Sequence, residues 1–168
     1  MKELKSVRYI VVHCTATRCN KPFSVEKLIN CGVGKYGQCS YHYYVRLDGT
    51  VVPLLPESVQ GVHARGYNSW SLGVVYEGGV DENGKNKDTR TAEQKHTLYA
   101  LLKELTRSYP EAHIIGHREL PKQQMPKELV LDWLSLDDSR RSQLPLVAKD
   151  CPCFPAFKEY ADLQPKSR

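Results

Sequence analysis

Three side chains of types that bind metals stand where a folded chain could bring them together. His13 follows a β-branched run, His117 follows a second apolar run, and Cys151 lies in an irregular, Pro-rich segment. Zinc enzymes commonly hold their metal with three protein ligands of these types and leave a fourth tetrahedral position for water. The metal lowers the pKa of that water. The water can then lose a proton near neutral pH and attack a carbonyl group. The three residues therefore indicate metal-assisted hydrolysis.

Each of these residues by itself is weak evidence for a metal site. A single histidine beside a strand is more often a hydrogen-bonded core or surface residue than a ligand. Cys153 also competes with Cys151, because either thiolate of an irregular segment could face the metal. We favour Cys151, but the assignment depends on the elements and motifs that surround it.

Short buried strands are predicted to position the two histidines. Residues 9–14 and 71–76 are β-branched or apolar runs typical of central strands, and residues 112–116 form a third, shorter run. His13 and His117 then stand where strands end, which is where sheet enzymes place site residues. The ends of these two strands are therefore the expected place for a site.

A hairpin is predicted between residues 41 and 55. The dipeptide Asp48-Gly49 stands between two strand-like runs and readily supplies the positive φ angles of a tight turn. This geometry places Tyr41 at the open end of the hairpin.

Helices are predicted from their caps. Thr91 begins the clearest one, where Gln94 completes a capping box and leucines recur on one face until Pro110 stops the helix. Ser24 is expected to cap a shorter helix. Glycines at positions 32 and 34 are expected to close that helix, and residues 155–163 are expected to form a last short one.

Strands interleaved with helices predict one α/β domain with a central mixed sheet flanked by helices. The length of 168 residues fits a single domain, which we place at residues 1–163. Residues 121–148 are predicted to be a loop insertion, either a lid or groove wall or a segment that packs against the sheet. Residues 164–168 are expected to be a disordered tail.

Five short motifs follow one another along the chain. They are Val12-His13-Cys14-Thr15-Ala16-Thr17, Tyr41-His42-Tyr43 with Asp48-Gly49-Thr50, His63-Ala64-Arg65-Gly66-Tyr67-Asn68, Gly116-His117-Arg118-Glu119, and Lys149-Asp150-Cys151-Pro152-Cys153-Phe154. In this order they resemble the type 2 N-acetylmuramoyl-L-alanine amidases, the family of phage zinc lysozymes and animal peptidoglycan-recognition proteins. The resemblance covers most of the chain and is greatest to the phage branch.

The resemblance implies a Zn²⁺ site formed by His13, His117 and Cys151, with Tyr41 and Lys149 as catalytic residues. The implied substrate is peptidoglycan or a muropeptide. The implied reaction is hydrolysis of the amide between the lactyl group of N-acetylmuramic acid and the L-alanine of the stem peptide, by attack of zinc-bound water. In that reaction the metal and Lys149 would stabilise the oxyanion, and the Tyr41 hydroxyl would bond to the water or the oxyanion.

The resemblance also suggests residues that contact the substrate. His63, Arg65 and Asn68 belong to the motif that borders the substrate groove in the family, and Arg65 is suited to a peptide carboxylate. Glu119 fits either a general base for the water or a carboxylate that holds a histidine ring nitrogen.

The remaining cysteines and the charge are less informative. Cys14 is expected to face away from His13 and to pack in the core. Cys19, Cys31 and Cys39 lie in a polar, Gly-rich region where disulfides are conceivable. The net charge of +5 comes from dispersed residues with no basic run, so no nucleic-acid partner is expected.

Membrane insertion is not expected, because no stretch is long and apolar enough to span a bilayer. The first residues carry no apolar signal core, so we expect cytoplasmic synthesis and action on the cell wall after release. An extracellular or periplasmic location would follow if a signal had been trimmed. The protein is expected to be a monomer.

Two other functions compete with the amidase. A module of the same fold could bind peptidoglycan without cutting it, but the complete set of candidate ligands argues against this. A structural zinc site could use Cys153 as its fourth ligand, yet a Cys-x-Cys spacing is tighter than usual and no groove-reading helix is apparent.

Overall fold

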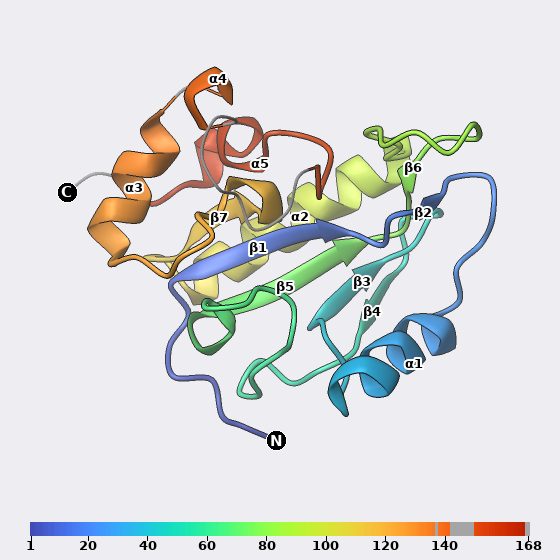
Figure 1. Cartoon of the computed structure of the whole chain (residues 1–168), viewed down its shortest axis with the longest axis horizontal. Helices are drawn as coiled ribbons and strands as arrows, with labels where there is room; N and C mark the ends of the chain where they lie inside the picture. The colour runs from blue at the N-terminus through green and yellow to red at the C-terminus, as the bar shows by residue number, and fades with distance from the viewer. Residues whose placement is uncertain (137, 142–149, 167–168) are drawn as a thin grey trace.

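A computed structural model describes residues 1–136, 138–141 and 150–166, so Lys149 lies outside the described residues. A five-stranded sheet in the order β4-β3-β5-β1-β7 forms its centre (Figure 1). The strands are β1 (Tyr9–Cys14), β3 (Tyr43–Val45), β4 (Val51–Pro53), β5 (Ser71–Tyr76) and β7 (His113–Gly116). Neighbouring strands are parallel except for β3 and β4, which are antiparallel. The predicted α/β fold with a mixed sheet is therefore confirmed.

Helices and a small second sheet complete the described chain. Strands β2 (Thr17–Arg18) and β6 (Gly79–Val80) pair in parallel. The helices are α1 (Val25–Tyr36), α2 (Ala92–Ser108), α3 (Lys127–Ser135), α4 (Asp138–Arg141) and α5 (Ala156–Glu159), and the 3₁₀ turns are η1 (Asn68–Trp70), η2 (His117–Glu119) and η3 (Ala161–Leu163).

The two faces of the sheet bury different clusters because side chains alternate along each strand. Ile10 and Val12 of β1 pack on the face covered by α2, which crosses behind the sheet in Figure 1. Tyr9 and Val11 pack on the opposite face, together with Val130 of α3. Strand β1 is buried along its whole length, so its last residues are held rigidly.

Local turn and cap signals predicted two features correctly. Strands β3 and β4 form the hairpin around Asp48-Gly49, although both strands are shorter than expected, and Gly49 has a φ of 84°. The capping box of α2 is present, because the Thr91 hydroxyl accepts from the Gln94 N–H and the Gln94 side chain accepts from the Thr91 N–H. Helix α2 ends at Ser108, two residues before the predicted stop.

Helix α1 differs from its predicted extent. Ser24 caps its first turn as expected, but the helix continues through Gly32 and Gly34 and ends at Gly37, where φ is 75°. A Cβ on Gly32 would lie 2.8 Å from the backbone oxygen of Gln38. Gly32 therefore permits close packing inside the helix, and the predicted termination there was wrong.

Two helices, Lys127–Ser135 and Asp138–Arg141, lie in the segment predicted as a loop insertion. Helix α3 buries Val130, Trp133 and Leu134 against the sheet, and the Trp133 indole N–H donates to the Glu119 carbonyl at 2.9 Å. Residues 127–135 thus pack against the sheet rather than forming an open loop, and residues 142–148 lie outside the described residues.

Gln164 is part of the folded domain. Its side-chain oxygen accepts from the Ile114 N–H at 3.0 Å, and its amide donates to the Ile114 carbonyl at 2.8 Å. These bonds satisfy backbone groups on the free edge of β7.

Candidate metal centre

The register of the sheet places His13 beside His117. Val12 of β1 pairs in parallel with Gly116 of β7, so the next residue of each chain emerges at the same edge. The centroids of the two imidazole rings are 4.6 Å apart. The two histidines meet at the carboxyl ends of their strands, as the sequence predicts.

Cys151 reaches this edge from the C-terminal segment. Its Sγ lies 3.8 Å from His13 Nδ1 and accepts a hydrogen bond from the Cys14 N–H at 3.3 Å. The Cys151 carbonyl accepts from the Arg118 N–H at 2.6 Å, which ties the segment to the turn that carries His117. Potential ligand atoms of His13, His117 and Cys151 all lie within 4.8 Å of one another.

This donor set fits a zinc ion. Tetrahedral zinc, with bonds of about 2.3 Å to sulfur and 2.0 Å to nitrogen, sets the two donors roughly 3.5 Å apart. The distance between His13 Nδ1 and Cys151 Sγ is close to that value. Nε2 of His117 is buried and has no hydrogen-bond partner among the described residues. A buried nitrogen without a partner is costly unless something such as a metal satisfies it.

Cys153 points elsewhere. Its backbone has a φ of 73°, and its Sγ donates to the Gly79 carbonyl at 3.4 Å. Cys14 packs in the core on the α2 face, as expected. All six cysteines lie among the described residues and none forms a disulfide, so the conceivable bridges of Cys19, Cys31 and Cys39 are not present.

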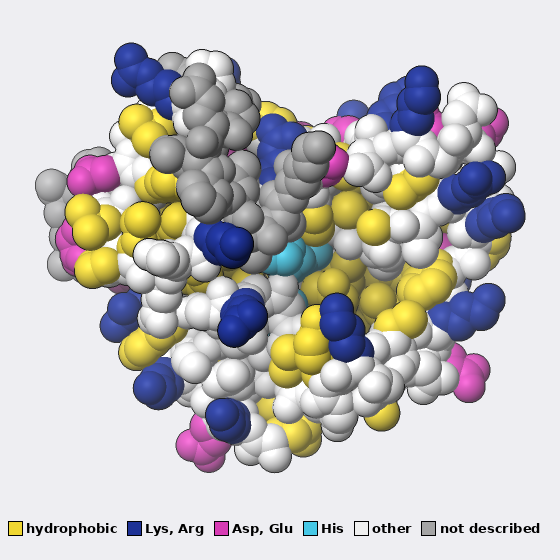
Figure 2. Space-filling model, in the orientation of Figure 1, with side chains coloured by type: hydrophobic (Ala, Val, Ile, Leu, Met, Phe, Trp, Pro, Cys, Tyr) yellow, Lys and Arg dark blue, Asp and Glu magenta, His cyan; other side chains and the backbone are white. Residues whose placement is uncertain are grey.

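A pocket opens next to the three donors. It has a volume of about 350 Å³ and is lined by Tyr36, Val62, His63, Ala64, Arg65, Asn68 and His117. In the space-filling view of Figure 2, the face turned to the viewer has a hollow near its middle. Histidine lies at the floor of this hollow, and Lys and Arg side chains surround it. The candidate centre is therefore open to a ligand from one side.

Comparison with known proteins identifies the family. A family model described as N-acetylmuramoyl-L-alanine amidase matches residues 3–128, more than half of the chain. The chain belongs to this amidase family. The match includes His13, Tyr41, His63 and His117. It ends before Cys151, so the assignment of Cys151 as the third donor rests on the geometry of the structure.

The relatives include phage endolysins. The endolysin of Enterobacteria phage K11 is 32% identical over 124 residues, which cover 73% of this chain and 82% of the relative. The endolysin of Escherichia phage T7 is 32% identical over 133 residues, which cover 79% and 88%. The solved structure of an endolysin N-acetylmuramoyl-L-alanine amidase from Clostridium intestinale is 26% identical, with a TM-score of 0.58 and coverage of 78% and 85%. The family and enzyme class predicted from the sequence are thus confirmed.

Tyr41 of this amidase lies over the candidate centre. Its ring centroid is 5.1 Å from that of His13, with the rings edge to face. Burial raises the pKa of the Tyr41 hydroxyl above its usual range, so the group stays protonated near neutral pH. It can serve as a hydrogen-bond donor but not as a general base.

Glu119 supports the turn that carries His117. The carboxylate is 2% exposed, and its Oε2 accepts from the Gly116 N–H at 2.6 Å and from the Phe157 N–H at 3.0 Å. These bonds connect the end of β7 to α5. Glu119 therefore fixes backbone around the centre through its contacts with N–H groups.

The three residues predicted to bind substrate differ in position. Arg65 is exposed on the pocket rim. Asn68 uses its side-chain oxygen to accept from the N–H groups of His63 and Ala64, at 2.9 and 2.7 Å. His63 is 8% exposed, and its Nδ1 lies 3.0 Å from Nε2 of His13. No motif or spacing in the sequence signals this contact between two histidines.

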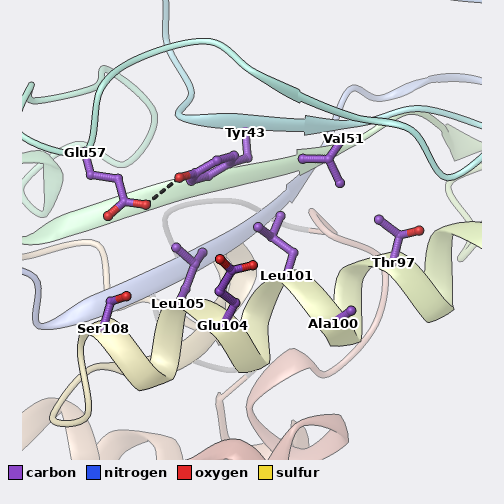
Figure 3. A pocket seen from close by; sticks show the side chains of 9 residues that line it. All are labelled: Tyr43, Val51, Glu57, Thr97, Ala100, Leu101, Glu104, Leu105 and Ser108. Carbon is purple, nitrogen blue, oxygen red and sulfur yellow. Dashed lines mark hydrogen bonds between the residues drawn. The ribbon is translucent and has the colours of Figure 1, made fainter.

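Another pocket, of about 360 Å³, lies between the hairpin and α2 (Figure 3). Tyr43 and Val51 line it on the α2 face, opposite the face to which His13 points. The Glu57 carboxylate accepts from the hydroxyls of Tyr43 and Tyr109, the latter at 2.6 Å. These bonds tether the hairpin to the end of α2, so we assign this pocket a structural origin.

Burial keeps the histidines of the centre neutral. It lowers the pKa of His13 well below its usual range, with further lowering by the neighbouring charges of His117 and His63. The pKa of His117 falls to about 4 and that of His63 to about 3, both chiefly through desolvation. Neutral imidazole is the form that binds a metal.

Stability of the metal-free amidase is expected to fall as the pH is lowered from 6.5 towards 4. The unfolded histidines bind protons below about pH 6.5, whereas folded His117 does so only near pH 4, so unfolding takes up protons in this window. Urea unfolding in the presence of a chelator should show a loss of at least about 2 kcal/mol between pH 7.5 and pH 5. If the free energy of unfolding stays constant over this pH range, burial does not lower the pKa of these histidines.

Among the described residues, no helix has both the length and the apolar character needed to cross a membrane.

Proposed function

We propose that this chain is a zinc-dependent N-acetylmuramoyl-L-alanine amidase that hydrolyses the bond between the lactyl group of N-acetylmuramic acid and the L-alanine of the stem peptide. The observation that carries the proposal is the convergence of His13, His117 and Cys151 at one edge of the sheet, in a member of this amidase family. Peptidoglycan or a muropeptide is the proposed substrate.

The proposed roles follow from the chemistry of each group. Zinc, when bound, supplies a Lewis acid that polarises the amide carbonyl and lowers the pKa of a water molecule. His13 and His117 provide neutral nitrogen donors, and Cys151 provides a thiolate. The protonated Tyr41 hydroxyl donates to the developing oxyanion, and the cation of Lys149 is proposed to stabilise the same charge.

The pocket beside the centre is the proposed site for the stem peptide. Arg65 on its rim is suited to a peptide carboxylate through a charge-assisted hydrogen bond. His63 and Asn68, whose polar atoms bond to the protein, are proposed to shape the pocket wall. We propose that the amidase acts on the cell wall as a monomer, in the manner of an endolysin.

The test measures metal and product together. Purified protein is expected to contain one zinc per chain and to release new alanine amino groups from isolated peptidoglycan. Removal of zinc with a chelator should stop this release, and added Zn²⁺ should restore it. Zinc-loaded protein that binds every peptidoglycan type but releases no amine would instead identify a binding module.

A further inference from the structure

A buried chain of hydrogen-bonded polar groups begins at Nε2 of His13, the ring nitrogen that does not face the candidate metal site. Nε2 of His13 lies 3.0 Å from Nδ1 of His63, and Nε2 of His63 lies 3.4 Å from Oγ of Ser71. The Ser71 hydroxyl in turn donates to the Tyr67 carbonyl at 2.8 Å. His13, His63 and Ser71 are 1%, 8% and 0% exposed, so bulk water does not compete for these bonds.

The position of one proton determines the positions of the others. Two oxygens 2.8 Å apart need a proton between them, and only Ser71 has one to donate to the Tyr67 carbonyl. Ser71 can then only accept from His63, which places the single ring proton of neutral His63 on Nε2. Nδ1 of His63 is left as an acceptor, so the proton between the two rings belongs to Nε2 of His13.

We propose that His63 is a positioning residue that holds His13 in the tautomer protonated on Nε2. In that tautomer Nδ1 of His13 carries a free lone pair, and Nδ1 is the nitrogen that faces Cys151 Sγ. Groups that bond to the second nitrogen of a ligating histidine fix its tautomer and ring orientation. This inference rests on the proposed metal site and gives His63 a role beyond contact with substrate.

The His63 ring packs directly against two glycines, where a larger residue would collide with it. A Cβ on Gly73 would lie 2.8 Å from His63 ring atoms, and a Cβ on Gly61 would lie 2.9 Å from them. Gly73 stands inside strand β5, where glycine is unfavourable unless something approaches closely. The Asn68 side chain also holds the backbone N–H of His63. The imidazole is thus fixed by packing as well as by hydrogen bonds.

The tautomer can be read directly in the metal-free protein. Two-dimensional ¹H–¹⁵N spectra of the histidine rings at pH 7.5 distinguish a proton on Nε2 from one on Nδ1. We expect both His13 and His63 to carry the proton on Nε2. A His13 ring protonated on Nδ1 in the wild-type protein would overturn the proposal.

Zinc affinity provides the second readout. His63→Phe fills the same space without an acceptor, and competition with a chromophoric chelator should show about 10- to 100-fold weaker Zn²⁺ binding. His63→Gln keeps an acceptor oxygen and should recover most of this affinity. His96→Phe, on an exposed part of α2, is the matched control and should bind zinc like the wild type. Equal affinity in the wild type and a folded His63→Phe would refute the positioning role.

A further variant covers the case in which His63→Phe does not fold. Ser71→Ala removes the group that accepts from Nε2 of His63, and the ring spectra should then show His63 no longer held in one tautomer. Unchanged spectra would refute the proposed proton positions in the hydrogen bonds that join His13, His63 and Ser71. Neither readout involves substrate, so zinc-loaded protein that cuts no peptidoglycan would refute the proposed function and leave this inference standing.

Discussion

Replacing Cys151 with serine is expected to weaken zinc binding by more than about 100-fold, because loss of a ligand costs more than the 10- to 100-fold loss typical of its supporting residues. Serine offers a neutral hydroxyl in place of the thiolate near His13 Nδ1, and Cys153, the alternative donor, has its Sγ bonded to the Gly79 carbonyl. Amidase activity should fall on the order of 1,000-fold or more, since the water would no longer be acidified. Metal content and release of alanine amino groups measure the two effects.

Cys153→Ser is the matched control for this substitution. The Cys153 thiol donates to the Gly79 carbonyl, a contact that a serine hydroxyl can replace. Its zinc content and activity should stay close to those of the wild type. If instead Cys153→Ser loses the metal and Cys151→Ser keeps it, the assignment of the third donor is wrong.

The amidase is expected to lose about 2 kcal/mol of stability when Arg90 is replaced by methionine, because hydrogen bonds to charged groups typically contribute about 1.5–3 kcal/mol. The Arg90 side chain is 2% exposed and bonds to Asp88 at 2.8 Å and to Glu159 at 2.9 Å. Its guanidinium carbon lies 3.4 Å from the centroid of the Phe154 ring, close enough for a cation–π contact. Methionine keeps much of the apolar volume but none of these interactions. Both carboxylates are partly exposed and can be rehydrated when Arg90 is lost, which limits the loss of stability.

Urea unfolding of Arg90→Met and of Arg107→Met tests this expectation. Arg107 is exposed near the end of α2, so its replacement should change stability by less than about 0.5 kcal/mol. Because Phe154 follows the Cys151 segment directly, Arg90→Met should also bind zinc more weakly. A loss of less than about 1 kcal/mol in Arg90→Met would show that the ion pairs contribute little.

Local signals account for the parts of the fold that the sequence predicts. The capping box of Thr91 and the turn at Asp48-Gly49 are decided within a few residues, so reading those residues suffices. Whether a glycine ends a helix depends on its surroundings. Gly32 sits inside α1 because the chain near Gln38 packs against it, a contact that the spacing of glycines cannot reveal.

Some contacts of the candidate site could also be predicted from the sequence, and others could not. His13 and His117 were predictable as neighbours, because strand ends of a parallel sheet meet at one edge. The bond between His13 and His63 joins residues fifty positions apart and depends on how the loop before β5 packs. Sequence motifs gave His63 a place near the site, but only the structure shows that its ring nitrogens bond to the protein.

The chain order of the three donors has a consequence for folding. His13 and Cys151 are separated by 138 positions, so their contact closes one of the longest loops that this chain can form. Closing a long loop costs chain entropy, and contacts between residues far apart in sequence slow folding. Chain emerging from a ribosome already contains His13 and His117 long before Cys151 is made. A nascent chain therefore holds an incomplete set of the three candidate donors until Cys151 is made, and the set is completed only when the C-terminal segment docks.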